Sequence, residues 1–278
     1  MDNFSYPIVL SIAGSDSGGG AGIQADIKTI SALGCFATTA ITAVTVQNTL
    51  GLSAIHPIPV DFVKAQIKAV MDDLRPSAIK IGMVHSAELA IGIAEALNEY
   101  QHVPVVFDPV MVASSGDSLV ESGTIATFKH YLFPLTQLLT PNLDEAALLA
   151  QMDIEHVEDM KNAAVKILMS GVNAVLIKGG HLKGSELIDI YRDKDGNERT
   201  FSSTAIESLN THGTGCSLSS AIASYVALGH DMEAAIAKAK TYVHQAIYQG
   251  IDVKTGKGHG PLNHFFDPKK LVKKKNFS

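Results

Sequence analysis

Residues 210–216 (NTHGTGC) place a thiol and two glycines directly before the strongly helical segment 217–228. Glycines at a helix start expose consecutive backbone N–H groups, and the positive end of the helix dipole favours an anion there. Cys216 at this point is expected to have a lowered pKa and a sulfur that faces whatever the amides bind. Residue types alone leave a second interpretation equally open, namely a tight turn with Cys216 as a small buried apolar residue.

Acidic and basic side chains follow other apolar runs. Asp108 ends one run, residues 140–145 (TPNLDE) end another, and Lys178 with Gly179 and Gly180 ends a third. Asn142 and Glu145, three apart on a first helical turn, could reach Mg²⁺ or its waters, although ordinary helix-start chemistry explains a carboxylate there equally well. A lysine before two glycines suits a phosphate, but a lysine in solvent is the common case.

A second glycine-rich loop, residues 14–22, has five glycines in nine residues and stands between an apolar run and a helix. Residues 20–25 fit the G-x-G-x-x-A form of a dinucleotide site. That site needs an acidic residue about 20 positions further on, and none lies between residues 27 and 60. A dinucleotide site is therefore disfavoured, and the chain has no P-loop, nucleophile-elbow or zinc-protease motif.

The elements that must position these residues are read from hydrophobic periodicity. Short β-branched runs alternate with helical spacing, which predicts a mostly parallel sheet covered by helices on both faces. We expect strands at 8–13, 36–44, 78–83, 103–108, 138–140 and 174–178, and helices that include 23–33, 62–74, 214–228 and 232–249. Strand-like runs at 186–192 and 198–203 flank a turn signal and predict an antiparallel edge hairpin. The candidate residues would then gather at the carboxyl ends of the strands, where such sheets bind ligands.

Composition excludes several classes of protein. Five lysines of the 278-residue chain lie in the tail 269–278, and the remaining 17 basic and 28 acidic residues give the body a charge of −11. Such a body disfavours general binding to nucleic acid. Two cysteines exclude a disulfide framework, and the amino-terminal residues lack the pattern of a signal peptide. We expect a cytoplasmic protein without a membrane span, forming one domain over residues 1–278 with solvated tail lysines.

The motifs resemble, in chain order, those of the hydroxymethylpyrimidine/phosphomethylpyrimidine kinases, which are thiamine-biosynthetic members of the ribokinase superfamily. The segments that carry the resemblance are 13–26, 80–83, 108–111, 140–145, 178–181 and 212–216. The resemblance implies a three-layer α/β/α ribokinase-like fold, a homodimer, and the use of ATP with Mg²⁺. It implies phosphorylation of 4-amino-5-hydroxymethyl-2-methylpyrimidine to the monophosphate and then to the diphosphate, with no second enzyme in the chain.

The same resemblance implies roles for single residues. Cys216 would be the general base, and Gly213, Thr214 and Gly215 would form the anion hole under the transferring phosphoryl group. Asp108, Asn142 and Glu145 would organise Mg²⁺, partly through water. The implied ATP-binding residues are Asn142, Glu145, Lys178, Gly179, Gly180, Asp189, Thr211, Gly215 and Lys240. The implied pyrimidine-binding residues are Gly14, Ala21, Asp26, Gln47, Met83, Val110 and Cys216.

Pyridoxal kinases share nearly all of these motifs, so a pyridoxine or pyridoxal kinase, or an enzyme acting on both substrates, is the nearest alternative. The Gln47 amide favours the pyrimidine because it offers both a donor and an acceptor to an aminopyrimidine edge. An interpretation in which Gln47 only satisfies loop backbone stays open. An alternative of another class is a vitamin-binding protein without catalysis, and the intact Cys216, Lys178, Asn142 and Glu145 oppose it.

Overall fold

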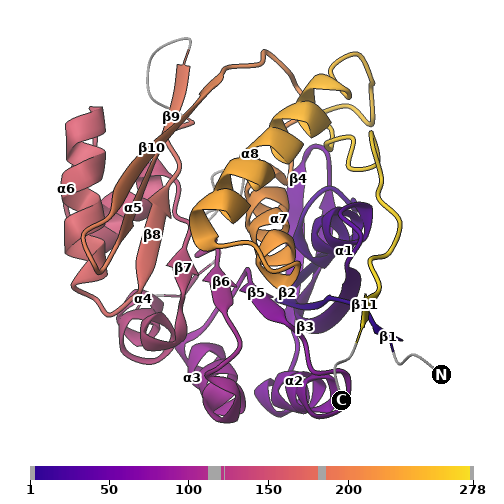
Figure 1. Ribbon diagram of the computed structural model, residues 1–278, viewed down its shortest axis with the longest axis vertical. Helices are drawn as coiled ribbons and strands as arrows, with labels where there is room; N and C mark the ends of the chain where they lie inside the picture. The colour runs from indigo at the N-terminus through magenta and orange to yellow at the C-terminus, as the bar shows by residue number, and fades with distance from the viewer. Residues whose placement is uncertain (1–3, 112–119, 122, 181–185, 276–278) are drawn as a thin grey trace.

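A computed structural model describes residues 4–111, 120–121, 123–180 and 186–275, and its centre is a nine-stranded sheet (Figure 1). The strand order is β10-β9-β8-β7-β6-β5-β2-β3-β4. The strands are β2 (Ile8–Asp16), β3 (Phe36–Asn48), β4 (Gly51–Pro57), β5 (Ala78–Ile81), β6 (Val105–Phe107), β7 (Leu138–Leu139), β8 (Ala174–Ile177), β9 (Glu186–Asp193) and β10 (Glu198–Thr204).

The six strands predicted from apolar runs are all present and pair in parallel, from β3 through β2, β5, β6 and β7 to β8. The predicted hairpin is β9 and β10, which are antiparallel to each other, and β9 is antiparallel to β8. The sequence did not predict β4, which pairs antiparallel with β3 at the opposite edge. The sheet is therefore mostly parallel with antiparallel strands at both edges.

Helices cover the sheet on both faces, as expected (Figure 1). One face carries α2 (Val60–Leu74), α3 (Ala87–Leu97), α4 (Thr124–Thr127), α5 (Leu143–Ala150) and α6 (Val157–Leu168), and the other carries α1 (Gly22–Ala32), α7 (Thr214–Ala227) and α8 (Met232–Tyr248). Short turns, η1 (Asn98–Tyr100), η2 (Phe128–Leu132) and η3 (Phe133–Leu135), connect elements on the first face. Two separate apolar cores result, one on each side of the sheet. The three-layer α/β/α architecture is confirmed.

The chain ends pair with each other outside the main sheet, where β1 (Phe4–Ser5) is antiparallel to β11 (Lys274–Lys275). The Lys274 ammonium donates to the Ala227 carbonyl at 2.7 Å, and the Lys269 amide donates to the Ala32 carbonyl at 2.8 Å. This part of the lysine-rich tail therefore packs along α1 and α7, which differs from the expectation of solvated charge alone. Among the described helices, none combines the length and the apolar character needed to cross a membrane.

Candidate active site

The start of α7 touches the other glycine-rich loop. Gly213 has a φ of 84°, a value that glycine adopts without strain, and a Cβ there would lie 1.8 Å from the Gly20 carbonyl oxygen. A Cβ on Gly20 would in turn lie 2.3 Å from the ring of His212. Cys216 lies in the first turn of α7, and the backbone N–H of Gly22, at the start of α1, donates to its sulfur. Two helix starts therefore meet at this thiol.

The prediction of a lowered pKa for Cys216 is wrong. Burial raises the pKa of Cys216 to about 11, and the nearby carboxylates of Asp26 and Asp108 add to the rise. The Lys80 ammonium and the Gly22 amide act in the opposite direction but do not compensate. The sequence pattern identified the helix start correctly, but it gave no sign that the sulfur would be so densely surrounded.

Lys178 and Asp108 form an ion pair beside this helix start. The Lys178 ammonium donates to Asp108 Oδ1 at 2.8 Å, and the Thr140 hydroxyl donates to the same oxygen at 3.0 Å. A Cβ on Gly215 would lie 3.3 Å from Lys178 Nζ and 3.5 Å from Asp108 Oδ2. The alternative of a solvated strand-end lysine is therefore wrong, because the Lys178 side chain is only 17% exposed. Its ammonium is directed at Gly215 in the loop 211–216, which is called the anion-hole loop below.

Asn142 and Glu145 form a capping box at the start of α5. Asn142 Oδ1 accepts the Glu145 amide at 2.9 Å, and Glu145 Oε2 accepts the Asn142 amide at 2.8 Å. Glu145 Oε1 accepts the Met111 amide at 3.3 Å. Burial raises the pKa of Glu145 to about 7, with Asp108 adding to the rise, while Lys178 and the two amides lower it. Helix-start chemistry thus accounts for the side-chain hydrogen bonds of this pair.

The same residues fit a magnesium ion that is held partly through water. Asp108, Asn142 and Glu145 offer oxygen donors only, which is the ligand type that Mg²⁺ prefers. No cluster of three or more metal-ligating His, Cys, Asp or Glu side chains occurs among the described residues. Mg²⁺ is usually bound by one or two carboxylates together with waters and substrate phosphates.

A second charged pair lies beside β8 and β9. The Gly179 amide donates to Asp189 Oδ1 at 2.9 Å, and the Lys240 ammonium of α8 donates to Asp189 Oδ2. A Cβ on Gly179 would lie 1.9 Å from the Ile188 carbonyl oxygen, so the glycine permits the close approach of the two strands. Gly180 is exposed with open space around it, and His181 lies outside the described residues.

Hydrogen bonds between Thr211 and Thr214 close the anion-hole loop on itself. Thr211 is exposed, and its carbonyl oxygen accepts the Thr214 hydroxyl at 2.7 Å and the Thr214 amide at 3.2 Å. These two bonds hold the turn that presents the amides of Gly215 and Cys216. The sequence-predicted residues Gly213 to Cys216 therefore lie together with Lys178 and Asp108, as expected.

A small apolar surface joins β3 and β4 to the segments that follow β5 and β6. Met83 and Ala43 are buried there, with Leu52, Ile55 and Val110 packed against them. A Cβ on Gly14 would lie 3.6 Å from the Met83 sulfur, so this glycine brings strand β2 close to the surface. Sequence reasoning missed Ala43, Leu52 and Ile55. Prediction of the β3–β4 hairpin would have found the last two.

Gln47 stands at the edge of this apolar surface and faces the anion-hole loop. Its Nε2 lies 3.5 Å from His212 Nε2, and its Oε1 lies 3.3 Å from the Thr45 hydroxyl. His212 Nε2 also lies 3.0 Å from Asp16 Oδ2, and a carboxylate only accepts, so this nitrogen carries a proton. An N–H on His212 cannot accept a hydrogen bond from the Gln47 amide nitrogen.

Asp16 organises the glycine-rich loop 14–22. Its carboxylate accepts the amides of Gly18, Gly20 and Ala21 at 2.8, 3.0 and 2.8 Å. Burial alone would raise the pKa of Asp16, but the hydrogen bonds from His212 and these amides lower it overall. Sequence reasoning missed this function of Asp16. An acidic residue two positions before a run of glycines was the signal.

The expectation that Asp26 lines the pyrimidine is not met by this structure. Asp26 is completely buried, and its carboxylate accepts Lys80 at 2.9 and 3.0 Å, the Ser11 hydroxyl at 2.5 Å and the Ser220 hydroxyl at 2.6 Å. Every lone-pair direction of the carboxylate is thereby used. Asp26 lies underneath the site instead of facing into it.

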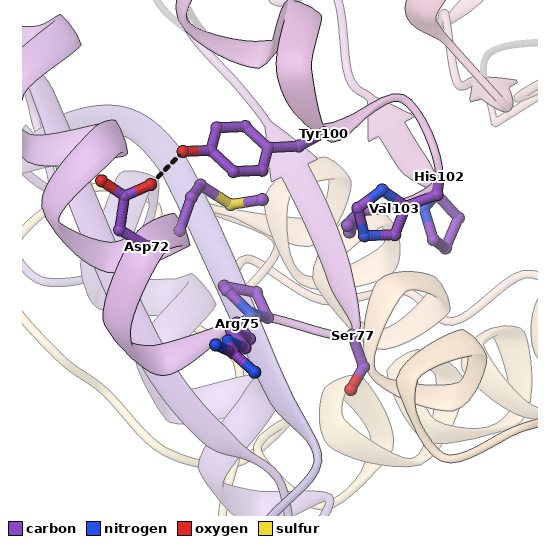
Figure 2. Close-up of a pocket in the computed structure, with 9 residues that line it drawn as sticks. Asp72, Arg75, Ser77, Tyr100, His102 and Val103 are labelled. Atoms are coloured by element: carbon purple, nitrogen blue, oxygen red, sulfur yellow. Dashed lines mark hydrogen bonds between the residues drawn. The ribbon is translucent and has the colours of Figure 1, made fainter.

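A pocket of about 500 Å³ lies elsewhere on the molecule, between the end of α2 and the amino ends of β5 and β6 (Figure 2). Its lining includes Asp72, Arg75, Tyr100 and His102, and the Tyr100 hydroxyl points at the Asp72 carboxylate (Figure 2). No sequence-predicted site residue lines it. The candidate site is instead at the carboxyl ends of the strands, where parallel sheets bind ligands.

The family model for phosphomethylpyrimidine kinase matches residues 16–263. The chain belongs to this family. A hydroxymethylpyrimidine/phosphomethylpyrimidine kinase of Rhizobium meliloti is 48% identical over 259 residues, which cover 93% of this chain and 97% of the relative. The thiamine biosynthesis bifunctional protein ThiED of Geobacter sulfurreducens is 47% identical over 92% of this chain, and the chain spans about half (52%) of that longer relative.

Solved structures of the family agree in fold. The phosphomethylpyrimidine kinase of Clostridium difficile is 42% identical, with a TM-score of 0.77 over 86% of this chain and 99% of that chain. The pyridoxal kinase of Bacillus subtilis in an ADP complex is 34% identical, with a TM-score of 0.84 over 94% of this chain and 98% of that chain. The protein is therefore a kinase with the ribokinase-like fold that the resemblance implied.

Proposed function

We propose that this kinase transfers the γ-phosphoryl group of ATP to 4-amino-5-hydroxymethyl-2-methylpyrimidine, and then phosphorylates the monophosphate to the diphosphate, in thiamine biosynthesis. The observation that carries the proposal is the place of the first turn of α7. Gly215 in that turn lies beside the Lys178–Asp108 ion pair, and His212, just before the turn, lies beside Gln47 at the edge of the apolar surface of Met83, Leu52 and Ile55.

In the proposed reaction the amides of Gly213 to Cys216 receive the charge that develops on the transferring phosphoryl group. Lys178 contacts the ATP phosphates, and Asp108, Asn142 and Glu145 hold Mg²⁺, which supplies charge neutralisation on those phosphates. Gly179, Gly180, Thr211, and the Asp189–Lys240 pair line the nucleotide. The acidic body can therefore bind ATP, because the positive groups are local.

The acceptor side follows from the remaining residues. The flat ring lies against Met83 and Val110 near Gly14 and Ala21, and the Gln47 amide pairs with the aminopyrimidine edge. In the first step the hydroxyl oxygen bonds to the γ-phosphorus and the bond to ADP breaks. The hydroxyl proton passes to the sulfur of Cys216, which accepts it in the thiolate form. In the second step the acceptor oxygen belongs to a phosphate that is already anionic, so no base is required.

The variant Cys216→Ala tests this division. Loss of a proton acceptor is expected to lower the rate of the alcohol step by about 10² to 10⁴ and to leave the phosphate step much less affected. Each step is measured separately, from the pyrimidine alcohol and from its monophosphate, by ADP release. An equal fold loss in both steps would show that Cys216 is not the base.

Pyridoxal or pyridoxine phosphorylation is a second candidate, because the pyridoxal kinases of Bacillus subtilis and Staphylococcus aureus match with TM-scores of 0.84. The variant Gln47→Leu separates the two. It removes the amide from the site, so kcat/KM for the aminopyrimidine should fall by at least tenfold while the KM for ATP stays unchanged.

Pyridoxal turnover that exceeds pyrimidine turnover in the unaltered protein would favour the second candidate. No turnover of either substrate would favour a vitamin-binding protein. A homodimer and a cytoplasmic location stay predictions.

A further inference from the structure

The ion pair under the site has no place in the reaction described so far. Lys80 and Asp26 are both completely buried, with a relative accessibility of 0% for each side chain. Lys80 stands inside the otherwise apolar strand β5, and Asp26 lies in α1. Replacing a buried ion pair by apolar residues is often neutral or stabilising, so stability alone gives a weak reason for such a pair.

Hydrogen bonds tie the pair to the helix that carries Cys216. Asp26 Oδ1 accepts the Ser220 hydroxyl at 2.6 Å, and Ser220 is four residues after Cys216 on α7. Residues four apart on a helix share a face, with their Cβ atoms roughly 5–6 Å apart. The two charges therefore lie within about one helical turn of the thiol. Asp26 Oδ2 also accepts the Ser11 hydroxyl of β2, so the contacts join four elements.

Glycine at position 82 is what allows the ammonium to lie there. A Cβ on Gly82 would be 2.8 Å from Lys80 Nζ and 3.0 Å from the Ala13 side chain. Burial opposes a charged lysine, but the Asp26 carboxylate, with Cys216 and Asp108, holds the pKa of Lys80 above its ordinary value. Lys80 is therefore a fixed positive charge beneath the site.

We propose that Lys80 and Asp26 are positioning residues that set the charge beneath Cys216: the Lys80 cation favours the thiolate that the alcohol step requires, and Asp26 holds and partly offsets that cation. The other charged groups around the thiol are Asp108, at the end of β6, and Lys178, at the end of β8. These two form their own ion pair, so the thiol lies near two ion pairs, of which Lys80–Asp26 is the completely buried one. The proposal rests on Cys216 as the proposed base, but its test needs no turnover.

The test is the rate of iodoacetamide alkylation at Cys216, followed by peptide mass spectrometry between pH 6 and 9. Asp26→Asn and Lys80→Met break the same ion pair but remove opposite charges. Asp26→Asn should speed alkylation about tenfold for each unit by which the thiol pKa falls, and Lys80→Met should slow it. The double variant should return to the rate of the unaltered protein.

Two controls separate a charge effect from loosened packing. Cys35 is 1% exposed in the core beneath α7, so its alkylation reports opening of the fold within the same sample. Ser220→Ala removes a hydrogen bond to Asp26 without changing charge, and its Cys216 rate should stay within about twofold. If Lys80→Met does not fold, Asp26→Asn and Ser220→Ala still carry the test.

Shifts of the same sign in both single variants, or a joint rise at Cys216 and Cys35, would overturn the proposal. An unchanged rate in Asp26→Asn, as expected if Lys80 simply lost its proton there, would overturn it as well. Opposite shifts in alkylation with equal losses in the two phosphorylation steps would support the charge assignment, and would remove only the proposed role of Cys216 as the base.

Discussion

The contact between the two glycine-rich loops makes a quantitative prediction for Gly213→Ala. The added Cβ would lie 1.8 Å from the Gly20 carbonyl oxygen, whereas real Cβ atoms essentially never come closer than 3.0 Å to a neighbouring atom. The loops must therefore separate by about 1.2 Å, the difference between these two distances. The φ of 84° adds backbone strain of about 1 kcal/mol for alanine.

The expected effect is on catalysis more than on stability. A misplacement of about 1 Å in a reacting group can cost about 10² in rate, so kcat should fall by about that factor. Strain of about 1 kcal/mol lowers Tm by about 2–4 °C in a chain of this size, and displacement of the Gly20 carbonyl adds to that fall. Both are measured on one preparation, kcat by ADP release and Tm by calorimetry.

Gly229→Ala is the matched control. Gly229 follows the other end of α7 with a φ of 98°, and a Cβ there would have nothing within 4 Å. This variant should show the strain without the displacement, that is, a fall in Tm of only about 2–4 °C and an unchanged kcat. The reasoning is refuted if Gly213→Ala keeps kcat within about threefold of the unaltered protein, or if Gly229→Ala loses as much activity.

Two further predictions concern a buried histidine and the helix N-caps. Burial, with Lys28 nearby, lowers the pKa of His264 to about 4 from an ordinary value of 6.5. Because the unfolded chain binds more protons between those values, the free energy of unfolding should fall by up to about 3 kcal/mol as pH drops from 6.5 to 4. Urea titrations of His264→Gln should show a flatter dependence of this free energy on pH. Asn142→Ala and Asp231→Ala each remove a helix N-cap and should each cost about 1 kcal/mol of stability. Only Asn142→Ala should also raise the KM for ATP. Equal KM values in the two variants would exclude a nucleotide or metal role for Asn142.

Buried parallel strands were predictable because both of their faces are covered. Their residues form nearly continuous apolar runs, as in Ala174–Ile177, and such runs need no knowledge of the partner strand. β4 was not predictable in the same way. It is an edge strand with no fully buried residue, it ends at Pro57, and its apolar residues do not alternate regularly.

The location of the site was predictable for the same reason that the fold was. Once the parallel strands are placed, residues such as Asp108 and Lys178 must lie at their carboxyl ends. Local pattern could not show which charges neutralise each other, because Asp26 and Lys80 are 54 residues apart in sequence. Lys80 inside the apolar strand Ala78–Ile81 was the available signal, since a lysine in a fully buried strand requires a partner.

Overall shape does not decide which vitamin precursor the protein phosphorylates. The pyridoxal kinase of Bacillus subtilis superposes with a TM-score of 0.84, and the phosphomethylpyrimidine kinase of Clostridium difficile, although more similar in sequence, with 0.77. The machinery proposed for transfer belongs to α7 and to the ends of β6 and β8, and it recognises phosphoryl groups, which both reactions share. Discrimination must therefore come from side chains around the acceptor ring. In the proposed site these are Gln47 and the apolar residues Leu52, Ile55, Met83 and Val110, so the β3–β4 hairpin is where a change of substrate would be engineered first.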